Sequence, residues 1–291
     1  MKNNTLKRFV SVAVALFIAV SAFTTASAAT YFEENGFEFS PMNQFNCRIY
    51  GYTDTKTDVV VPNKLSSYTV LEIADYAFLN NSGIETVSFA DAKAIDAIGE
   101  FAFSGCTQLK KISIPMTLDK IGYGAFMGCT SLSDISIYSN ISDIKGQTFQ
   151  NCTSLTEFTV PNSVNTISDF AFAGCTSLQK ITIPKNVNNI SSKAFNGCDN
   201  LTIYGYLNSY AEEYANENGI KFLAIDKKIT LGDVNSDGTV DVNDVTLVQL
   251  YLAGVSDIVL NEDALVAANF NQDGQIDVID VTAIQYFIAS R

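Results

Sequence analysis

A pattern of hydrophobic and polar positions repeats every 23 residues through the middle of this 291-residue chain. Five cysteines mark the repeat, and each follows a phenylalanine by three residues and precedes a leucine by three. The three series are Cys106, Cys129, Cys152, Cys175 and Cys198; Phe103, Phe126, Phe149, Phe172 and Phe195; and Leu109, Leu132, Leu155, Leu178 and Leu201. A fixed period of this length predicts a solenoid, in which each turn buries its apolar face only by stacking on its neighbours.

Each repeat continues into a short alternation of apolar and polar residues, which predicts a β-strand. The alternations cover residues 112–114, 135–137, 158–160 and 181–183. We expect the polar side chains of these strands to point outward. They then form either a surface that binds a partner or a solvated face without a ligand. These positions are Lys111, Ser113, Asp134, Ser136, Glu157, Thr159, Lys180 and Thr182.

The start of the predicted solenoid is less regular. Apolar segments at residues 49–52, 59–62 and 70–73 predict degenerate first coils. The step from Phe78 to Phe103 is 25 residues, which predicts a two-residue insertion near residues 90–94.

The end of the solenoid carries signals of a cap, which a solenoid needs to avoid open-ended stacking. Ser209 and Glu212 have the spacing of a capping box, so we expect a short helix to about Glu217, with Gly219 at its stop. Residues 221–225 then predict a final strand. Four tyrosines cover the last coil or, alternatively, bind sugar: Tyr204, Tyr206, Tyr210 and Tyr214.

The repeat consensus resembles that of the BspA-like leucine-rich repeat family. It reads apolar–Gly/Ser–x–x–Ala–Phe–x–Gly–Cys–Thr–Ser–Leu–x–x–Ile–x–Ile–Pro, and the resemblance covers about residues 45–225. The resemblance implies a leucine-rich-repeat solenoid of short strands and 23-residue coils. Members of this family often mediate attachment, so it also implies a binding domain.

The six cysteines allow two interpretations. Six cysteines in an exported chain are consistent with a framework of disulfide bonds. A cysteine at the same point of every coil, however, predicts an inward ladder of small buried side chains, and parallel side chains give poor disulfide dihedrals. We expect free buried thiols. Cys47 lies outside the 23-residue period, so the ladder itself makes no prediction for it.

Two loops near the C-terminus share a pattern of oxygen-bearing residues, and they start at Asp233 and Asn269. Calcium binds about six to eight oxygens, which a 12-residue loop supplies from positions 1, 3, 5, 7, 9 and 12 around a glycine at position 6. Gly238 and Gly274 take that position here. The predicted ligands of two calcium ions are Asp233, Asn235, Asp237, Thr239, Asp241 and Asp244, and Asn269, Asn271, Asp273, Gln275, Asp277 and Asp280. Asn269 removes a charge at position 1, so we expect the second site to be weaker.

The loops resemble those of a type I dockerin. An ordinary EF-hand has Glu at position 12, whereas both loops here have Asp, and each runs into an apolar helical segment at residues 245–252 or 281–288. Loop–helix, linker, loop–helix over residues 231–291 implies a small all-α module that binds a cohesin domain of a scaffold protein. The resemblance places the cohesin-facing side chains at Val242, Asn243, Gln249 and Leu250, and at Val278, Ile279, Gln285 and Tyr286. Some of these apolar residues are alternatively core.

Residues 1–28 have the pattern of a secretory signal peptide. Lys2, Lys7 and Arg8 precede an apolar run at residues 9–23, and the small residues 26–28 form a cleavage motif. Removal of the three positive charges takes the formal net charge from −13 to −16. This acidity disfavours nucleic acid and anionic membrane surfaces as partners. The predicted domains are the signal peptide (1–28), the solenoid with its cap (29–225), a linker (226–230) and the dockerin (231–291).

The chain contains no histidine, which excludes Ser-His-Asp and Cys-His catalysis and the usual zinc sites. It also contains no tryptophan. Residues 45–225 are committed to repeats, which leaves too little chain for a catalytic domain. We therefore expect a secreted, non-catalytic component of a cellulosome-like complex, held at a cell surface through a scaffold, whose repeats bind a protein or glycan. A host- or cell-surface adhesin is the alternative. A polysaccharide-degrading enzyme is the third hypothesis.

Overall fold

The computed structural model describes residues 31–89, 94–138, 140–226 and 228–291. The predicted signal peptide lies outside these residues, and so does most of the predicted insertion near residues 90–94. The chain divides into two compact units, Met1–Ile225 and Asp226–Arg291, and each is described by itself. No described helix is long and apolar enough to cross a membrane.

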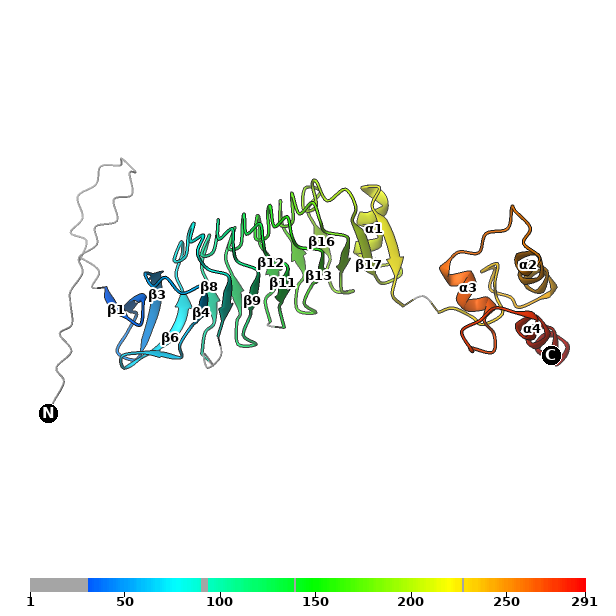
Figure 1. Cartoon of the computed structure of the whole chain (residues 1–291), viewed down its shortest axis with the longest axis horizontal. Coiled ribbons are helices and arrows are strands. Elements are labelled where there is room, and N and C mark those ends of the chain that lie inside the picture. Colours follow the sequence, from blue (N-terminus) through cyan, green and yellow to red (C-terminus); the bar gives the residue numbers. More distant parts are fainter. Residues whose placement is uncertain (1–30, 90–93, 139, 227) are drawn as a thin grey trace. The chain divides into compact units, whose positions relative to one another are not determined.

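The first unit is a solenoid in which successive coils add strands to two faces (Figure 1). One face carries mainly three-residue strands in parallel register, for example Ile112 opposite Ile135. Its strands are β4 (Asp58–Val60), β7 (Thr86–Ser88), β9 (Lys111–Ser113), β11 (Asp134–Ser136), β13 (Glu157–Thr159), β15 (Lys180–Thr182), β17 (Thr202–Gly205) and β18 (Lys221–Ala224). The four predicted strands form, but each begins and ends one residue earlier than the alternation indicated, at β9, β11, β13 and β15. The central residue of each observed strand is buried, and the polar residues on either side of it are exposed or half-buried, as the alternation predicts.

A second face of two-residue strands was not predicted from the sequence. It consists of β8 (Ala97–Ile98), β10 (Lys120–Ile121), β12 (Asp143–Ile144), β14 (Thr166–Ile167) and β16 (Asn189–Ile190). Two residues are too few for an alternation to be visible, so these strands exist only because coils 23 residues apart stack in register, as Ile98 does on Ile121.

The N-terminal end of the solenoid is closed by an antiparallel meander. It comprises β1 (Phe32–Glu34), β2 (Phe37–Pro41) and β3 (Asn46–Tyr52). Strand β3 pairs in parallel with β6 (Tyr68–Ile73), and β5 (Lys64–Leu65) pairs with β6 antiparallel. The predicted degenerate coils therefore include an N-terminal cap, in which the strands first pair antiparallel and β3 then pairs in parallel with β6.

A ladder of phenylalanine rings fills the core of the solenoid. Consecutive rings from Phe78 to Phe195 stack with centroids 4.7–5.6 Å apart. The ladder ends on Tyr52, 5.9 Å from Phe78, and on Tyr214, 6.0 Å from Phe195. Large buried rings dominate core energetics, so the repeat of Phe at one point of each coil accounts for much of the stacking.

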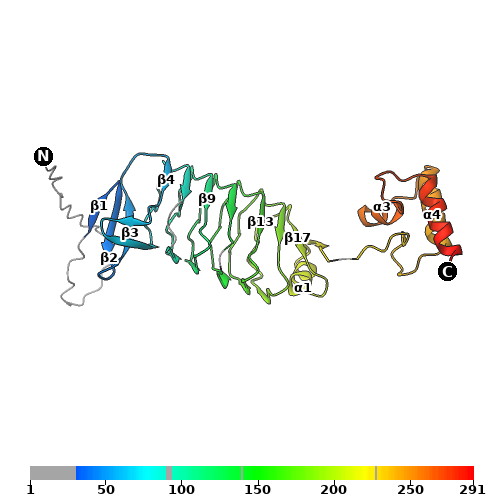
Figure 2. The same cartoon turned by 90° about the horizontal axis from the view of Figure 1, so that it is seen from below.

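The C-terminal end is covered by α1 (Tyr210–Glu217), which lies beside β17 and β18 (Figure 2). The predicted capping box is only half formed: the Ser209 hydroxyl accepts from the Glu212 amide at 3.4 Å, but the Glu212 carboxylate accepts from Asn208 rather than Ser209. Gly219, with a φ of +66°, follows the helix as expected. Of the four tyrosines Tyr214 is buried, Tyr204 and Tyr206 are half-buried, and Tyr210 is exposed.

The described residues of the second unit, 226 and 228–291, form three helices, whereas the sequence predicted two. They are α2 (Val242–Leu252), α3 (Glu262–Ala268) and α4 (Val278–Ala289). The segment between the two loop–helix motifs thus holds α3, a seven-residue helix that is capped by Asn261 and buries Ala264, Ala267 and Ala268. Its buried face consists of alanine, which gives a weak periodic signal, and this explains why the pattern alone missed it.

Candidate functional site

The first loop is organised around the carboxylate of Asp233. One oxygen accepts a hydrogen bond from the Asp237 amide at 3.0 Å, and the other accepts from the Gly238 amide at 3.0 Å. Gly238 has a φ of +88° and Gly274 a φ of +89°. Only glycine takes this conformation without strain, which explains the glycine at position 6 of each loop.

The last carboxylate of each loop is completely buried. Asp244 and Asp280 have a fractional exposure of 0%. Asp244 accepts from the Val234 amide at 2.7 Å and from the Asp241 amide at 2.9 Å; Asp280 accepts from Asn271 and Asp277, both at 3.0 Å. Each residue thereby completes a capping box with the N-cap aspartate of the following helix.

This capping explains where the helices begin. The sequence placed the apolar helical segments after each loop, but α2 and α4 start at Val242 and Val278, three residues earlier. Positions 9 to 12 therefore belong to the loop and the helix at once. A change in the loop is transmitted directly to the helix start, because Asp244 and Asp280 bond to both.

The middle positions of both loops make the same local contacts. The Asn235 side-chain amide donates to Asp237 at 2.8 Å, and the Asn271 amide donates to Asp273 at 2.9 Å. The Thr239 hydroxyl, the Thr239 backbone amide and the Asn235 amide lower the pKa of the exposed Asp237 carboxyl below its ordinary value. At position 7 of the second loop, Gln275 donates its backbone amide to Asp273 at 2.9 Å.

The two loops differ at position 1, and the difference bears on whether a metal fits. The Asn269 side-chain oxygen is buried and has no hydrogen-bond partner among the described residues, whereas Asp233 accepts two hydrogen bonds. An unpaired buried oxygen is costly unless a ligand satisfies it. All predicted ligands are oxygens, the donor type that calcium prefers, so the loop composition fits this ion. Across the described chain, no three His, Cys, Asp or Glu side chains converge as a ready-made metal site.

The predicted cohesin-facing side chains are all exposed. Fractional exposure reaches 66% for Val242, 70% for Val278, 57% for Ile279 and 76% for Tyr286. The opposite sides of the two helices are core, where Val245, Val248, Val281 and Ile284 are buried. None of the eight predicted residues is therefore buried core. At the start of α2 the exposed residues are Val242 and Asn243, and at the start of α4 they are Val278 and Ile279. The other four lie further along the same helices: Gln249, Leu250, Gln285 and Tyr286.

The predicted binding face of the solenoid is exposed except at Thr182, which is half-buried. Lys111 and Asp134 form an ion pair of 2.6 Å across neighbouring strands. The Lys180 ammonium lies 5.1 Å from the centre of the Tyr204 ring. Exposed pairs of this kind add little to stability, so the charges mainly shape the surface.

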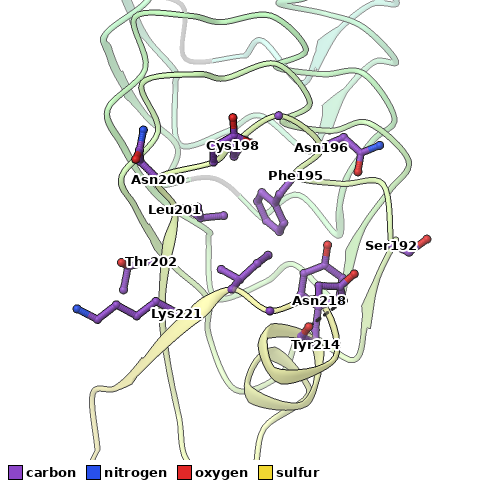
Figure 3. A pocket seen from close by; sticks show the side chains of 14 residues that line it. Ser192, Phe195, Asn196, Cys198, Asn200, Leu201, Thr202, Tyr214, Asn218 and Lys221 are labelled. Carbon is purple, nitrogen blue, oxygen red and sulfur yellow. Dashed lines mark hydrogen bonds between the residues drawn. The ribbon is translucent and has the colours of Figure 1, made fainter.

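A hollow of about 550 Å³ lies between the last coil and the cap (Figure 3). Phe195, Leu201 and Tyr214 line it, and burial raises the pKa of Tyr214 to about 12. The hollow lies where α1 follows the last regular coil, before β18 adds the final parallel strand. No sequence signal marks it.

Two family models match the chain. The BspA type leucine-rich repeat region matches residues 71–202 in six copies, and the dockerin type I domain matches residues 231–289. No curated protein matches the chain.

Solved structures resemble the chain over about the length of the solenoid. A leucine-rich cell surface protein from Faecalibacterium prausnitzii A2-165 is 25% identical, with a TM-score of 0.51, and the match covers 62% of this chain and 55% of that one. The leucine-rich repeat protein of T. pallidum is 23% identical, with a TM-score of 0.50, over 66% of this chain and 97% of that one. The chain thus spans only about half the length of the first of these proteins.

Proposed function

We propose that this chain, a BspA-type leucine-rich repeat region followed by a type I dockerin domain, is a secreted, non-catalytic component of a cellulosome-like complex. The dockerin domain binds a cohesin domain of a scaffold protein, and the repeats present a surface for a protein or glycan. The observation that carries the proposal is the pair of equivalent exposed helix starts, each held to its loop by a buried aspartate.

Calcium is the cofactor that this proposal requires. The side chains of Asp233, Asn235, Asp237 and Asp244 would hold the first ion, and those of Asn269, Asn271, Asp273 and Asp280 the second; Thr239, Gln275, Asp241 and Asp277 complete the predicted sets. Bound calcium neutralises carboxylates that otherwise repel one another. The residues of the chain then orient Val242 and Val278, because their loops and helices share the same capping aspartates.

The near-symmetry of the two helix starts leads to a specific docking test. Either helix is able to dominate the cohesin contact, so we expect Val242→Asp alone or Val278→Asp alone to leave most binding intact. The double variant should lose it. Calcium-dependent pull-down with a panel of cohesins measures this, and Val259→Asp, at a side chain 86% exposed outside both helices, is the matched control. Equal binding in the presence of a chelator would contradict the proposal.

Display as a host- or cell-surface adhesin is the second candidate function. The F. prausnitzii protein described as a cell surface protein favours it. Binding of residues 30–226 to cells or matrix proteins, compared with plant glycans, distinguishes the two functions. An enzymatic role has the least support, because the described chain offers only repeats and a dockerin domain. Hydrolysis of polysaccharide by the purified protein would revive it.

A further inference from the structure

The hydrogen-bonded strand ladders of the solenoid are interrupted between one pair of neighbouring coils in the described chain. On the first face β11 pairs with β9 and β13 with β15, and no ladder joins β11 to β13 in the described chain. On the second face β10 pairs with β8 and β12 with β14, and again no ladder joins β10 to β12. The turn segments of the same coils stay bonded, with the Phe126 amide 2.9 Å from the Thr148 oxygen. We call this interruption the seam.

A hollow of about 530 Å³ opens at the seam on the first face. Ser136, Tyr138 and Asn140 line one side of it, and Glu157, Thr159 and Asn162 line the other. Tyr138 stands where a proline ends the strand in the other regular coils, at Pro115, Pro161 and Pro184. Its side chain is 75% exposed and has no ring contact with another residue of the described chain.

Three polar side chains at the seam lack a partner in the described chain, whereas charged groups on the preceding strands are paired. Lys110 pairs with Glu85, and Lys111 pairs with Asp134. Glu157, by contrast, has no ion pair among the described residues, because its neighbour Lys180 lies over Tyr204 instead. The side chains of Asn140 and Asn162 also have no hydrogen-bond partner in the described chain. The seam thus collects one aromatic ring, one carboxylate and two amides that are ready for a ligand.

We propose that the seam binds a neutral oligosaccharide. The apolar face of a sugar ring stacks on Tyr138, whose ring is apolar and whose hydroxyl is polar. Sugar hydroxyls donate to the Glu157 carboxylate and exchange hydrogen bonds with Asn140 and Asn162. A few placed polar groups around an aromatic surface are typical of small-ligand sites. The inference rests on the proposed function, since it names the ligand that the repeats present to the complex.

Charge and shape favour this ligand over the alternatives. Glu157 is unpaired and the whole chain carries a formal net charge of −13, so an acidic sugar is repelled. A protein partner needs apolar anchors, but the exposed side chains of the hollow are polar apart from Tyr138. Hydroxyl groups without charge match this surface best.

The test uses the full chain with calcium and isothermal titration calorimetry. The probes are cellohexaose, xylohexaose and mannohexaose as neutral ligands, and an oligogalacturonate as the acidic one. We expect at least one neutral probe to bind and the acidic probe not to bind. Tyr138→Ala should weaken binding by about tenfold, which corresponds to about 1.4 kcal/mol. Glu157→Gln should weaken it as well.

Met116→Ala is the matched control, because Met116 follows the strand of the preceding coil and is also 75% exposed. It should leave sugar binding unchanged. The proposal is overturned if no neutral probe binds, if Tyr138→Ala binds as tightly as the unchanged protein, or if only the acidic probe or a protein ligand binds. Cohesin binding is measured on the same samples. If the unchanged protein binds cohesin but no neutral probe, the seam site alone is refuted. If it binds no cohesin, the proposed function is refuted.

Discussion

At the residue scale, the cysteines of the regular repeat add a hydrogen bond between neighbouring coils, to carbonyl oxygens that also accept a backbone amide. The thiols of Cys106, Cys129, Cys152, Cys175 and Cys198 donate to the carbonyl oxygens of Phe78, Phe103, Phe126, Phe149 and Phe172, at 3.0–3.2 Å. Each bond joins one coil to the coil before it, and each carbonyl group is buried with a partner. All six cysteines are free and buried, as expected from the sequence, including Cys47.

The buried thiols predict a loss of stability at high pH. Burial raises the pKa of Cys106 from 9.0 to about 12 and that of Cys198 to about 11. Above pH 9 the thiols ionise in the unfolded chain but stay neutral in the folded one. The stabilisation is therefore full below pH 9 and falls as the pH rises towards 11, by about 1.4 kcal/mol per pH unit for each thiol. Urea unfolding at pH 8 and pH 10.5 measures this.

Cys152→Ala is the control for the pH prediction, because burial also raises the pKa of Cys152 well above its ordinary value. The variant is less stable at pH 8, since it lacks the thiol packing. Its stability should nevertheless fall less steeply with pH than that of the unchanged protein. An identical slope in both proteins would show that the thiols are not the cause.

The buried oxygen of Asn269 leads to a prediction for the second loop. Asn269→Asp restores the charge that the first loop has at Asp233, so its calcium affinity should rise by about tenfold, about 1.4 kcal/mol. The reciprocal change Asp233→Asn should weaken the first loop by a similar factor. Calorimetric titration with calcium resolves the two steps. Unchanged affinity in both variants would mean that position 1 contributes little.

At the element scale, the stack of phenylalanine rings determines how firmly one coil holds the next. Phe149 is fully buried and contacts Phe126, Phe172 and Phe158, with ring centroids at 5.6, 5.2 and 5.1 Å. Phe149→Ala should lower the free energy of unfolding by about 3–5 kcal/mol, because it removes a large ring and leaves a cavity. Denaturant unfolding of the first unit measures the loss.

The exposed Met116 supplies the comparison for this stack. Met116→Ala should change the free energy of unfolding by no more than about 0.5 kcal/mol, as surface substitutions usually do. A loss below about 1 kcal/mol for Phe149→Ala would indicate that the ring ladder is adaptable rather than closely packed.

At the scale of the whole molecule, the two units should respond differently to calcium removal. The loops carry seven aspartates between them, and the buried Asp244 and Asp280 connect each loop to its helix. Without calcium these carboxylates repel one another, so metal binding and folding are linked. Chelation should therefore unfold the unit Asp226–Arg291 and leave the solenoid, from residue 31 to residue 225, folded.

Amide hydrogen exchange with and without EDTA checks this separation. Protection should disappear from α2, α3 and α4 and persist in the strands of the solenoid. Full protection of α2 and α4 in chelator would contradict the proposed role of calcium. Loss of protection in both units would contradict their independence.

Local sequence patterns determined the type of architecture and the candidate loops. The spacing of Phe126, Cys129 and Leu132 recurs in each regular coil, and the burial of these side chains follows from it. The two loops were predicted in the same way, because both repeat a glycine at position 6 with oxygen-bearing residues at the same positions around it. Repetition adds weak local signals together, so a short pattern becomes specific when a chain uses it several times.

Tertiary structure decided what depends on residues far apart in the chain. The two-residue strands form only because neighbouring coils stack. Helix α3 is identified by the burial of its alanines, which the sequence pattern did not indicate. The thiol hydrogen bonds join residues that are 26 or 28 positions apart. The seam beside Tyr138 likewise depends on the pairing of whole coils rather than on the sequence of either one. Side-chain type and spacing are local properties, whereas register, exposure and the absence of a partner are properties of the packed chain.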